Sequence, residues 1–103
     1  MNKYFVYIIQ CQDGSLYTGY STDPVKRFNK HLSGKGAKYT RSHKPQLFVF
    51  IQKMDTKVEA LKFEYKIKSL TRTQKIKLIE GCKEAQELAK EFNQEVYQNA
   101  KIN

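Results

Sequence analysis

Three short stretches rich in β-branched and aromatic residues predict three strands. The first, residues 3–10, is apolar at both alternating sets of positions, which is typical of a strand covered on both faces. Asp13 and Gly14 follow it as a turn signal, so residues 15–20 are expected to return as its hairpin partner. Residues 46–53 predict the third strand.

Polar and apolar positions then change to helical spacing. The first helix is predicted to begin with Thr22 or Asp23 as N-cap and Pro24 in its first turn. Its buried stripe is expected to comprise Val25, Phe28 and Leu32. Gly34 is expected to end it as a C-terminal cap, and a basic loop leads from there to Pro45.

The second half of the chain predicts three more helices. The capping-box pattern occurs at Thr56–Glu59 and again at Thr71–Gln74, for helices that run to about Leu70 and to Gly81. A terminal helix fits residues 83–97, with an apolar face of Ala85, Leu88, Ala89, Phe92 and Val96. The order is β-β-α-β-α-α with a C-terminal helix, and the hairpin makes the class α+β with an antiparallel sheet.

Composition restricts the class of protein and of partner. A chain of 103 residues, 40% apolar, supports one globular domain with one modest core. The net charge of +9 is uneven: residues 1–80 hold 16 Lys and Arg against 6 Asp and Glu, whereas residues 81–103 hold 3 against 4. A basic domain with interleaved tyrosines favours nucleic acid as the partner, and a merely lysine-rich surface is the alternative.

The cysteines and the N-terminus indicate the compartment. Cys11 and Cys82 have no metal-ligand or Cys-x-x-Cys spacing, so free thiols in a reducing cytosol are expected. The N-terminus lacks the pattern of a signal peptide, and no segment reaches the ~20 apolar residues that span a bilayer. We therefore expect a cytoplasmic protein without a membrane partner.

Tyr7 and Tyr17 fall on neighbouring predicted strands. Each alone is more simply a packing residue, but Gly19 within the second strand marks a bulge or a close approach of the backbone to a ligand. A phenol has a pKa near ~10, and nearby cations lower it. The excess of cations in this domain therefore favours an activated tyrosine.

Arg27 and His31 lie four residues apart and share one helix face. A guanidinium presents a planar fork to phosphate oxygens, and an imidazole can position or deprotonate a tyrosine hydroxyl or a water. The alternative is a solvated helix flank.

Glu64 falls between two apolar arcs of its predicted helix, together with Lys57 and Lys68. The arcs are Ala60, Phe63, Ile67 and Leu70 on one side and Val58, Leu61 and Tyr65 on the other. A carboxylate on the core side is costly unless it is paired or bound to a metal. A salt bridge to either lysine and a Mg²⁺ ligand are both open.

The basic loop adds candidate contacts to phosphates or bases. With the helix cation Lys26, the candidate nucleic-acid-binding residues are Lys35, Lys38, Tyr39, Thr40 and Arg41.

Together these motifs resemble the GIY-YIG nuclease domain. The resemblance rests on Phe5-Val6-Tyr7, Tyr17-Thr18-Gly19, Arg27 with His31, and Glu64, and it covers roughly residues 3–80. With the loop it is similar to small stand-alone bacterial members of that family. It implies a three-stranded antiparallel sheet flanked by helices, and divalent-metal-dependent cleavage of phosphodiester bonds.

The resemblance also implies roles for the site residues. Tyr7 and Tyr17 line the site, and one of them takes a proton from water while His31 supports it. Arg27 holds the scissile phosphate, and Glu64 binds Mg²⁺ or Mn²⁺. The sequence departs from the family at the first triad, at Thr18 in place of Ile, and at Tyr20, where some members carry a lysine that would activate the phenol.

The expected function is a metal-dependent endonuclease acting on DNA with little sequence specificity, in DNA repair or processing. Residues 1–81 would form the nuclease-like domain, and residues 82–103 a helical extension packed on it. One alternative is a non-catalytic nucleic-acid-binding module of the same fold, for DNA or RNA. Another is an adaptor that uses the acidic terminal helix, although no obligate protein partner is expected.

Overall fold

The computed structural model describes residues 3–35 and 42–102, with side chains described as far as Tyr97. Its strands are β1 (Tyr4–Cys11), β2 (Leu16–Ser21) and β3 (Pro45–Met54), and its helices are α1 (Pro24–Leu32), α3 (Lys57–Lys68), α4 (Arg72–Gly81) and α5 (Lys83–Ile102). The strands form one sheet in the order β2-β1-β3, with both pairs antiparallel. The predicted α+β class and element order are confirmed.

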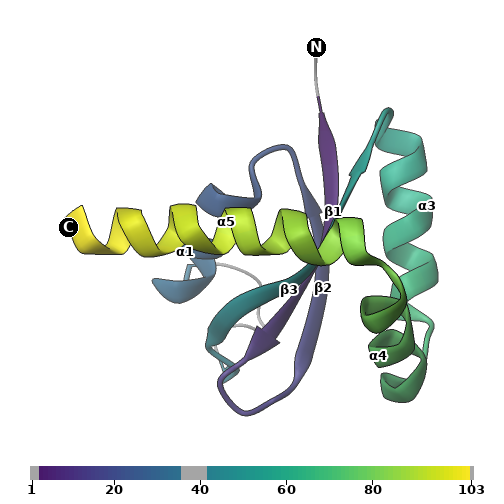
Figure 1. Cartoon of the computed structure of the whole chain (residues 1–103), viewed down its shortest axis with the longest axis horizontal. Helices are drawn as coiled ribbons and strands as arrows, with labels where there is room; N and C mark the ends of the chain where they lie inside the picture. The colour runs from purple at the N-terminus through teal and green to yellow at the C-terminus, as the bar shows by residue number, and fades with distance from the viewer. Residues whose placement is uncertain (1–2, 36–41, 103) are drawn as a thin grey trace.

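The central strand β1 is covered on both faces, as its continuous apolar pattern predicts. Tyr7 and Ile9 pack into one buried cluster with Phe28 of α1 and Ala89 of α5. Val6 and Ile8 pack into a second cluster, which contains buried residues of α3. In Figure 1, α5 runs across the sheet over α1, and α3 and α4 lie to one side.

A side-chain contact joins α5 to the edge strand β3. The pairing of β1 with β3 shifts register between Ile8 and Ile9, whose partners are Phe50 and Phe48. The Phe48 N–H donates to Asn93 Oδ1 at 2.7 Å, and Asn93 Nδ2 donates to the Phe48 carbonyl at 2.8 Å. The terminal helix therefore satisfies backbone groups at the sheet edge as well as burying apolar area.

The first helix is oriented differently from the prediction. Asp23 caps α1 by accepting from the Lys26 N–H, and Gly34 follows its end with a φ of +80°, as expected. The predicted stripe is wrong at Leu32, which is 42% exposed, whereas His31 is buried. Helical periodicity places both residues near the stripe, and in the structure it is His31 that lies against Tyr7 and Tyr17 of the sheet.

Only one of the two apolar arcs on α3 faces the core. Ala60 and Ile67 are buried, whereas Leu61 and Tyr65 of the other arc are exposed. The helix ends at Lys68, slightly before the expected Leu70. A helix packed against one sheet face can bury only one stripe, so the second arc faces solvent.

The last two helices agree with the capping signals. Thr71 and Gln74 form a reciprocal capping box at the start of α4, which ends at Gly81. The apolar face of α5 packs as predicted, and the helix continues beyond residue 97 to Ile102. Cys11 and Cys82 are free thiols, and no helix in the described ranges is long and apolar enough to cross a membrane.

Candidate functional site

Tyr7 and Gly19 lie directly opposite each other on β1 and β2. A Cβ atom placed on Gly19 would lie 2.7 Å from the Tyr7 hydroxyl oxygen and 2.9 Å from Cζ of its ring. Glycine at this position therefore allows the Tyr7 phenol to lie against the β2 backbone. The close approach predicted for Gly19 is made by Tyr7, a neighbouring side chain.

His31 of α1 lies between the two tyrosines. Its Nε2 atom is 3.5 Å from the Tyr7 hydroxyl oxygen, and its ring packs edge-on against Tyr17 with centroids 5.2 Å apart. His31 and Tyr7 are each only 1% exposed, whereas Tyr17 is half-buried. Of the two tyrosines, Tyr17 is therefore the one that solvent or a substrate can reach.

Burial controls the protonation states at this centre. Burial, together with the smaller effect of the Arg27 charge, lowers the pKa of His31 from 6.5 to about 4. Burial also raises the pKa of Tyr7 well above its usual value, and that of Tyr17 in the same direction. At neutral pH the imidazole is therefore neutral and both phenols keep their protons.

This result differs from the expectation that surrounding cations activate a phenol. The Arg27 guanidinium does lower the pKa of both tyrosines, but desolvation exceeds it at each ring. The charge of an ionised Tyr17 also raises the pKa of Tyr7.

Arg27 is exposed at the border of this centre. Its charge lowers the pKa of the Tyr7 phenol, and it shares with Lys26 and Lys30 a hollow of about 360 Å³ at the start of α1. Arg27 and Tyr20 both line a second hollow. The arginine can therefore contact a phosphate while it stays in electrostatic contact with the buried tyrosines.

Glu64 of α3 lies within electrostatic reach of both tyrosines, because its charge raises the pKa of each. Its side chain is 17% exposed, and Oε2 lies 3.5 Å from Lys68 Nζ. Of the alternatives left open by the sequence, the salt bridge to Lys68 is therefore present. It does not remove the metal role, because a half-exposed lysine can leave the carboxylate when a divalent cation binds.

Glu64 offers one carboxylate to a hard divalent cation that would take its other ligands from water and substrate. Among the described residues, no group of three or more His, Cys, Asp or Glu side chains could hold a metal ion. Mg²⁺ commonly takes one or two protein carboxylates and completes its shell with waters and phosphate oxygens. Glu64 can supply the single carboxylate of such a site.

The predicted nucleic-acid contacts divide into two groups. Lys26 and Lys35 are exposed on and just after α1. Lys38, Tyr39, Thr40 and Arg41 lie outside the described residues. Sequence reasoning missed Lys30, whose place one turn after Lys26 was the available signal.

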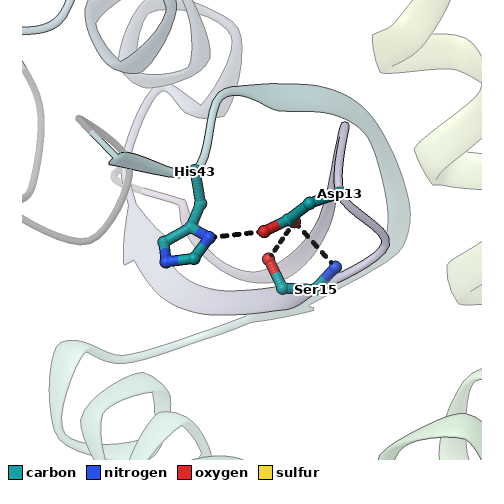
Figure 2. A network of polar contacts seen from close by, with 3 residues as sticks. All are labelled: Asp13, Ser15 and His43. Carbon is teal, nitrogen blue, oxygen red and sulfur yellow. Dashed lines mark hydrogen bonds and ion pairs between the residues drawn. The ribbon is translucent and has the colours of Figure 1, made fainter.

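A second polar cluster lies at the β1–β2 turn, away from this centre. His43 Nδ1 lies 2.6 Å from Asp13 Oδ2, and Ser15 donates to Asp13 Oδ1 from its hydroxyl at 2.6 Å and its N–H at 3.0 Å (Figure 2). These hydrogen bonds hold the pKa of Asp13 below its usual range, and the bond from the Ser15 hydroxyl has the largest effect. The serine is bonded to the aspartate and not to the histidine, so this is not the arrangement that activates a nucleophile.

A family comparison bears directly on the first centre. The family model described as the GIY-YIG catalytic domain matches residues 3–77, which include Tyr7, Tyr17, Arg27, His31 and Glu64. The chain belongs to the GIY-YIG family. The match ends within α4, so α5 lies beyond it.

GIY-YIG relatives of similar size support this assignment. The chain is 53% identical to a UPF0213 protein of Staphylococcus saprophyticus over 79 residues, covering 77% of this chain and 96% of the relative. It is 55% identical to a UPF0213 protein of Staphylococcus epidermidis over 80 residues, covering 78% and 98%. These names state no activity.

Solved GIY-YIG relatives show the same fold. The solution NMR structure of a UPF0213 protein of Bacillus halodurans has a TM-score of 0.51 at 47% identity, covering 76% of this chain and 83% of that one. That of a protein of E. faecalis has a TM-score of 0.57 at 40% identity, covering 79% and 86%. The family match indicates nuclease-type chemistry and contact with nucleic acid.

Proposed function

We propose that the protein is a metal-dependent endonuclease that hydrolyses phosphodiester bonds in DNA with little sequence specificity. The observation that carries the proposal is the convergence of a neutral buried His31, two tyrosines, an exposed Arg27 and a lone carboxylate, Glu64. The match of residues 3–77 to a nuclease family supports it. The basic surface of the first 80 residues favours an anionic polymer as substrate.

Arg27 would bind the scissile phosphate through its planar fork and balance the charge that develops on the phosphate oxygens. Its position supports this role, since it is exposed and its charge still lowers the pKa of both tyrosines. Glu64 would hold Mg²⁺ or Mn²⁺, which supplies Lewis-acid stabilisation of the phosphate and the leaving oxygen.

The proton from the attacking water would end on His31. The new bond joins the water oxygen to phosphorus, the bond to the leaving oxygen breaks, and the proton lost by the water needs a base to accept it. His31 is neutral but buried, so a tyrosine hydroxyl would connect it to the water, and the negative charge of the bound phosphate would raise the low pKa of the imidazole and favour the transfer. Tyr17 would make this connection, since it is half-buried and its ring packs against the imidazole, whereas the Tyr7 hydroxyl lies 3.5 Å from His31 Nε2 on the more buried side.

Cleavage of labelled single-stranded, duplex and branched DNA with Mg²⁺ or Mn²⁺ tests the proposal. We expect the wild type to cut, and Glu64→Gln and Tyr17→Phe to lose at least about 100-fold in rate, as removal of one stabilising group does elsewhere. Glu59→Gln is the matched control, because Glu59 is an exposed carboxylate on the same helix. Full cutting by Glu64→Gln would overturn the metal role.

The non-catalytic module remains the second candidate, and the observation behind it is Tyr20. This residue borders the hollow that contains Arg27, at the position where some relatives carry a lysine. Salt-sensitive binding without turnover in either metal would support this module and contradict the nuclease. Measuring binding and cleavage of RNA oligonucleotides of the same sequence and structure would show whether the protein acts on DNA or on RNA.

A further inference from the structure

Helix α3 carries an exposed apolar stripe that no core packing explains. Val58 is 61% exposed, Leu61 41% and Tyr65 77%. The buried side of the same helix is formed by Ala60 and Ile67. The stripe therefore faces solvent along about two turns of the helix, and its largest member is an aromatic ring.

The stripe begins beside the candidate catalytic carboxylate. Each helical residue turns by about 100°, so Leu61, Tyr65 and Val58 lie about 60°, 100° and 120° from Glu64 around α3. The core-facing residues lie on the other side of Glu64. A ligand that reaches Glu64 from solvent on this flank therefore passes over the stripe.

Lysines border the stripe on both of its long sides. Lys68, which pairs with Glu64, lies between Glu64 and the stripe, and Lys62 lies on its far side, about 160° from Glu64. Both lysines are exposed, as are Lys57 and Lys66. Alternation of cations with an exposed ring matches a polyanion that carries flat bases, such as an unpaired nucleic acid.

A second copy of the chain fits this surface less well. Each copy carries a net charge of +9, so apposed lysine-rich faces would repel. A duplex also fits less well, because its bases are already stacked and paired and present only their edges. An unpaired strand exposes base faces to Tyr65.

We propose that the α3 stripe, Val58, Leu61 and Tyr65, binds an unpaired stretch of nucleic acid next to the site of cleavage. One base stacks on Tyr65, its neighbour packs on Leu61 and Val58, and the flanking phosphates contact Lys62 and Lys68. This inference rests on the proposed function, because it identifies unpaired nucleotides as what the nuclease holds beside Glu64.

Binding without metal tests the surface separately from cleavage. Fluorescence anisotropy would measure the affinity of the full chain, in EDTA, for labelled oligo-dT, oligo-U and a duplex of equal length. Tyr65→Ala should weaken binding of an unpaired oligonucleotide by roughly 5- to 150-fold, the range expected for one base–aromatic stack. Tyr65→Phe keeps a stacking ring and should bind like the wild type.

The chain offers a matched control in Tyr97, which is 63% exposed on α5. Tyr97→Ala should leave all three affinities unchanged, and Tyr65→Ala should leave duplex binding unchanged. An oligonucleotide containing 5-iodouracil should photo-cross-link to the peptide containing Tyr65. Tyr65 and Tyr97 are both exposed, and alanine favours the helical conformation, so Tyr65→Ala and Tyr97→Ala are both expected to fold.

The outcomes distinguish this surface from the enzyme activity. Tyr65-dependent binding without cleavage in Mg²⁺ or Mn²⁺ would support the surface and contradict the nuclease. Cleavage with unchanged binding of unpaired strands by Tyr65→Ala would support the nuclease and overturn the surface. An equal loss of affinity by Tyr65→Ala for unpaired and for duplex DNA would also overturn it. So would sedimentation that shows a dimer for the wild type and a monomer for Tyr65→Ala.

Discussion

A single methyl group at Gly19 tests the geometry of the tyrosine–histidine centre. In Gly19→Ala the new Cβ would lie 2.7 Å from the Tyr7 hydroxyl oxygen and 2.9 Å from Cζ. Atoms in optimal contact are about 3.5–4.0 Å apart, so the ring would have to retreat by roughly 0.5–1 Å. Tyr7 is 1% exposed and packs edge-on against Phe48, with centroids 5.7 Å apart, so the core resists that movement.

The expected cost is that of overpacking a core, about 1–3 kcal/mol. Backbone strain adds nothing, because Gly19 is not among the described glycines with positive φ. In a domain of this size each kcal/mol lowers Tm by about 4–8 °C, so we expect a loss of roughly 5–20 °C. The same displacement should change the 3.5 Å distance between the Tyr7 hydroxyl and His31 Nε2.

Thermal unfolding followed by circular dichroism measures this loss. Gly81→Ala is the matched control: a Cβ at Gly81 meets nothing within 4 Å, so its Tm should stay the same or rise slightly. Tyr7→Phe removes the atom nearest the new methyl, so Gly19→Ala should cost less in that background. A Tm of Gly19→Ala within about 2 °C of the wild type, or an equal cost in both backgrounds, would refute the reasoning.

Three other predictions follow from polar groups that are buried or partly buried. The buried Thr18 hydroxyl has no hydrogen-bond partner in the described part of the chain. Thr18→Val should therefore raise the free energy of unfolding, measured in urea, by about 1 kcal/mol, and an unchanged free energy would contradict this reasoning. Asn93→Ala removes both hydrogen bonds to the Phe48 backbone and should lower the free energy of unfolding in urea by about 2 kcal/mol or more. Gln94→Ala, at an exposed neighbouring position, is the control, and an equal loss of stability in the two variants would count against the contact. Folding lowers the pKa of His31 from 6.5 to about 4, so between these pH values the unfolded chain binds the proton more tightly than the folded chain. The free energy of unfolding should therefore fall as the pH drops from 6.5 towards 4, by at most about 1.4 kcal/mol per pH unit. The stability difference between wild type and His31→Asn should therefore shrink over that window in urea titrations at several pH values, and a constant difference would disprove the shift.

The features fixed by short-range signals were predictable from the sequence. The Asp13-Gly14 turn, the Asp23 and Thr71 caps and the helix end at Gly34 all depend on a few neighbouring residues, and the structure has each of them. The continuous apolar run of β1 predicted a strand covered on both faces. The motifs with Tyr7, Tyr17, Arg27, His31 and Glu64 were sufficient to identify the family.

Tertiary packing decided the chemistry of the site, because desolvation depends on which side chains surround a group. The sequence alone suggested cations that lower a phenol pKa, but burial against the sheet raises the pKa of Tyr7 and leaves His31 neutral. Packing also chose His31 over Leu32 as the inward-facing residue of α1 and left Tyr65 in solvent. Periodicity gives the spacing of residues along one helix, whereas the surfaces brought together from distant parts of the chain determine which of its sides is buried.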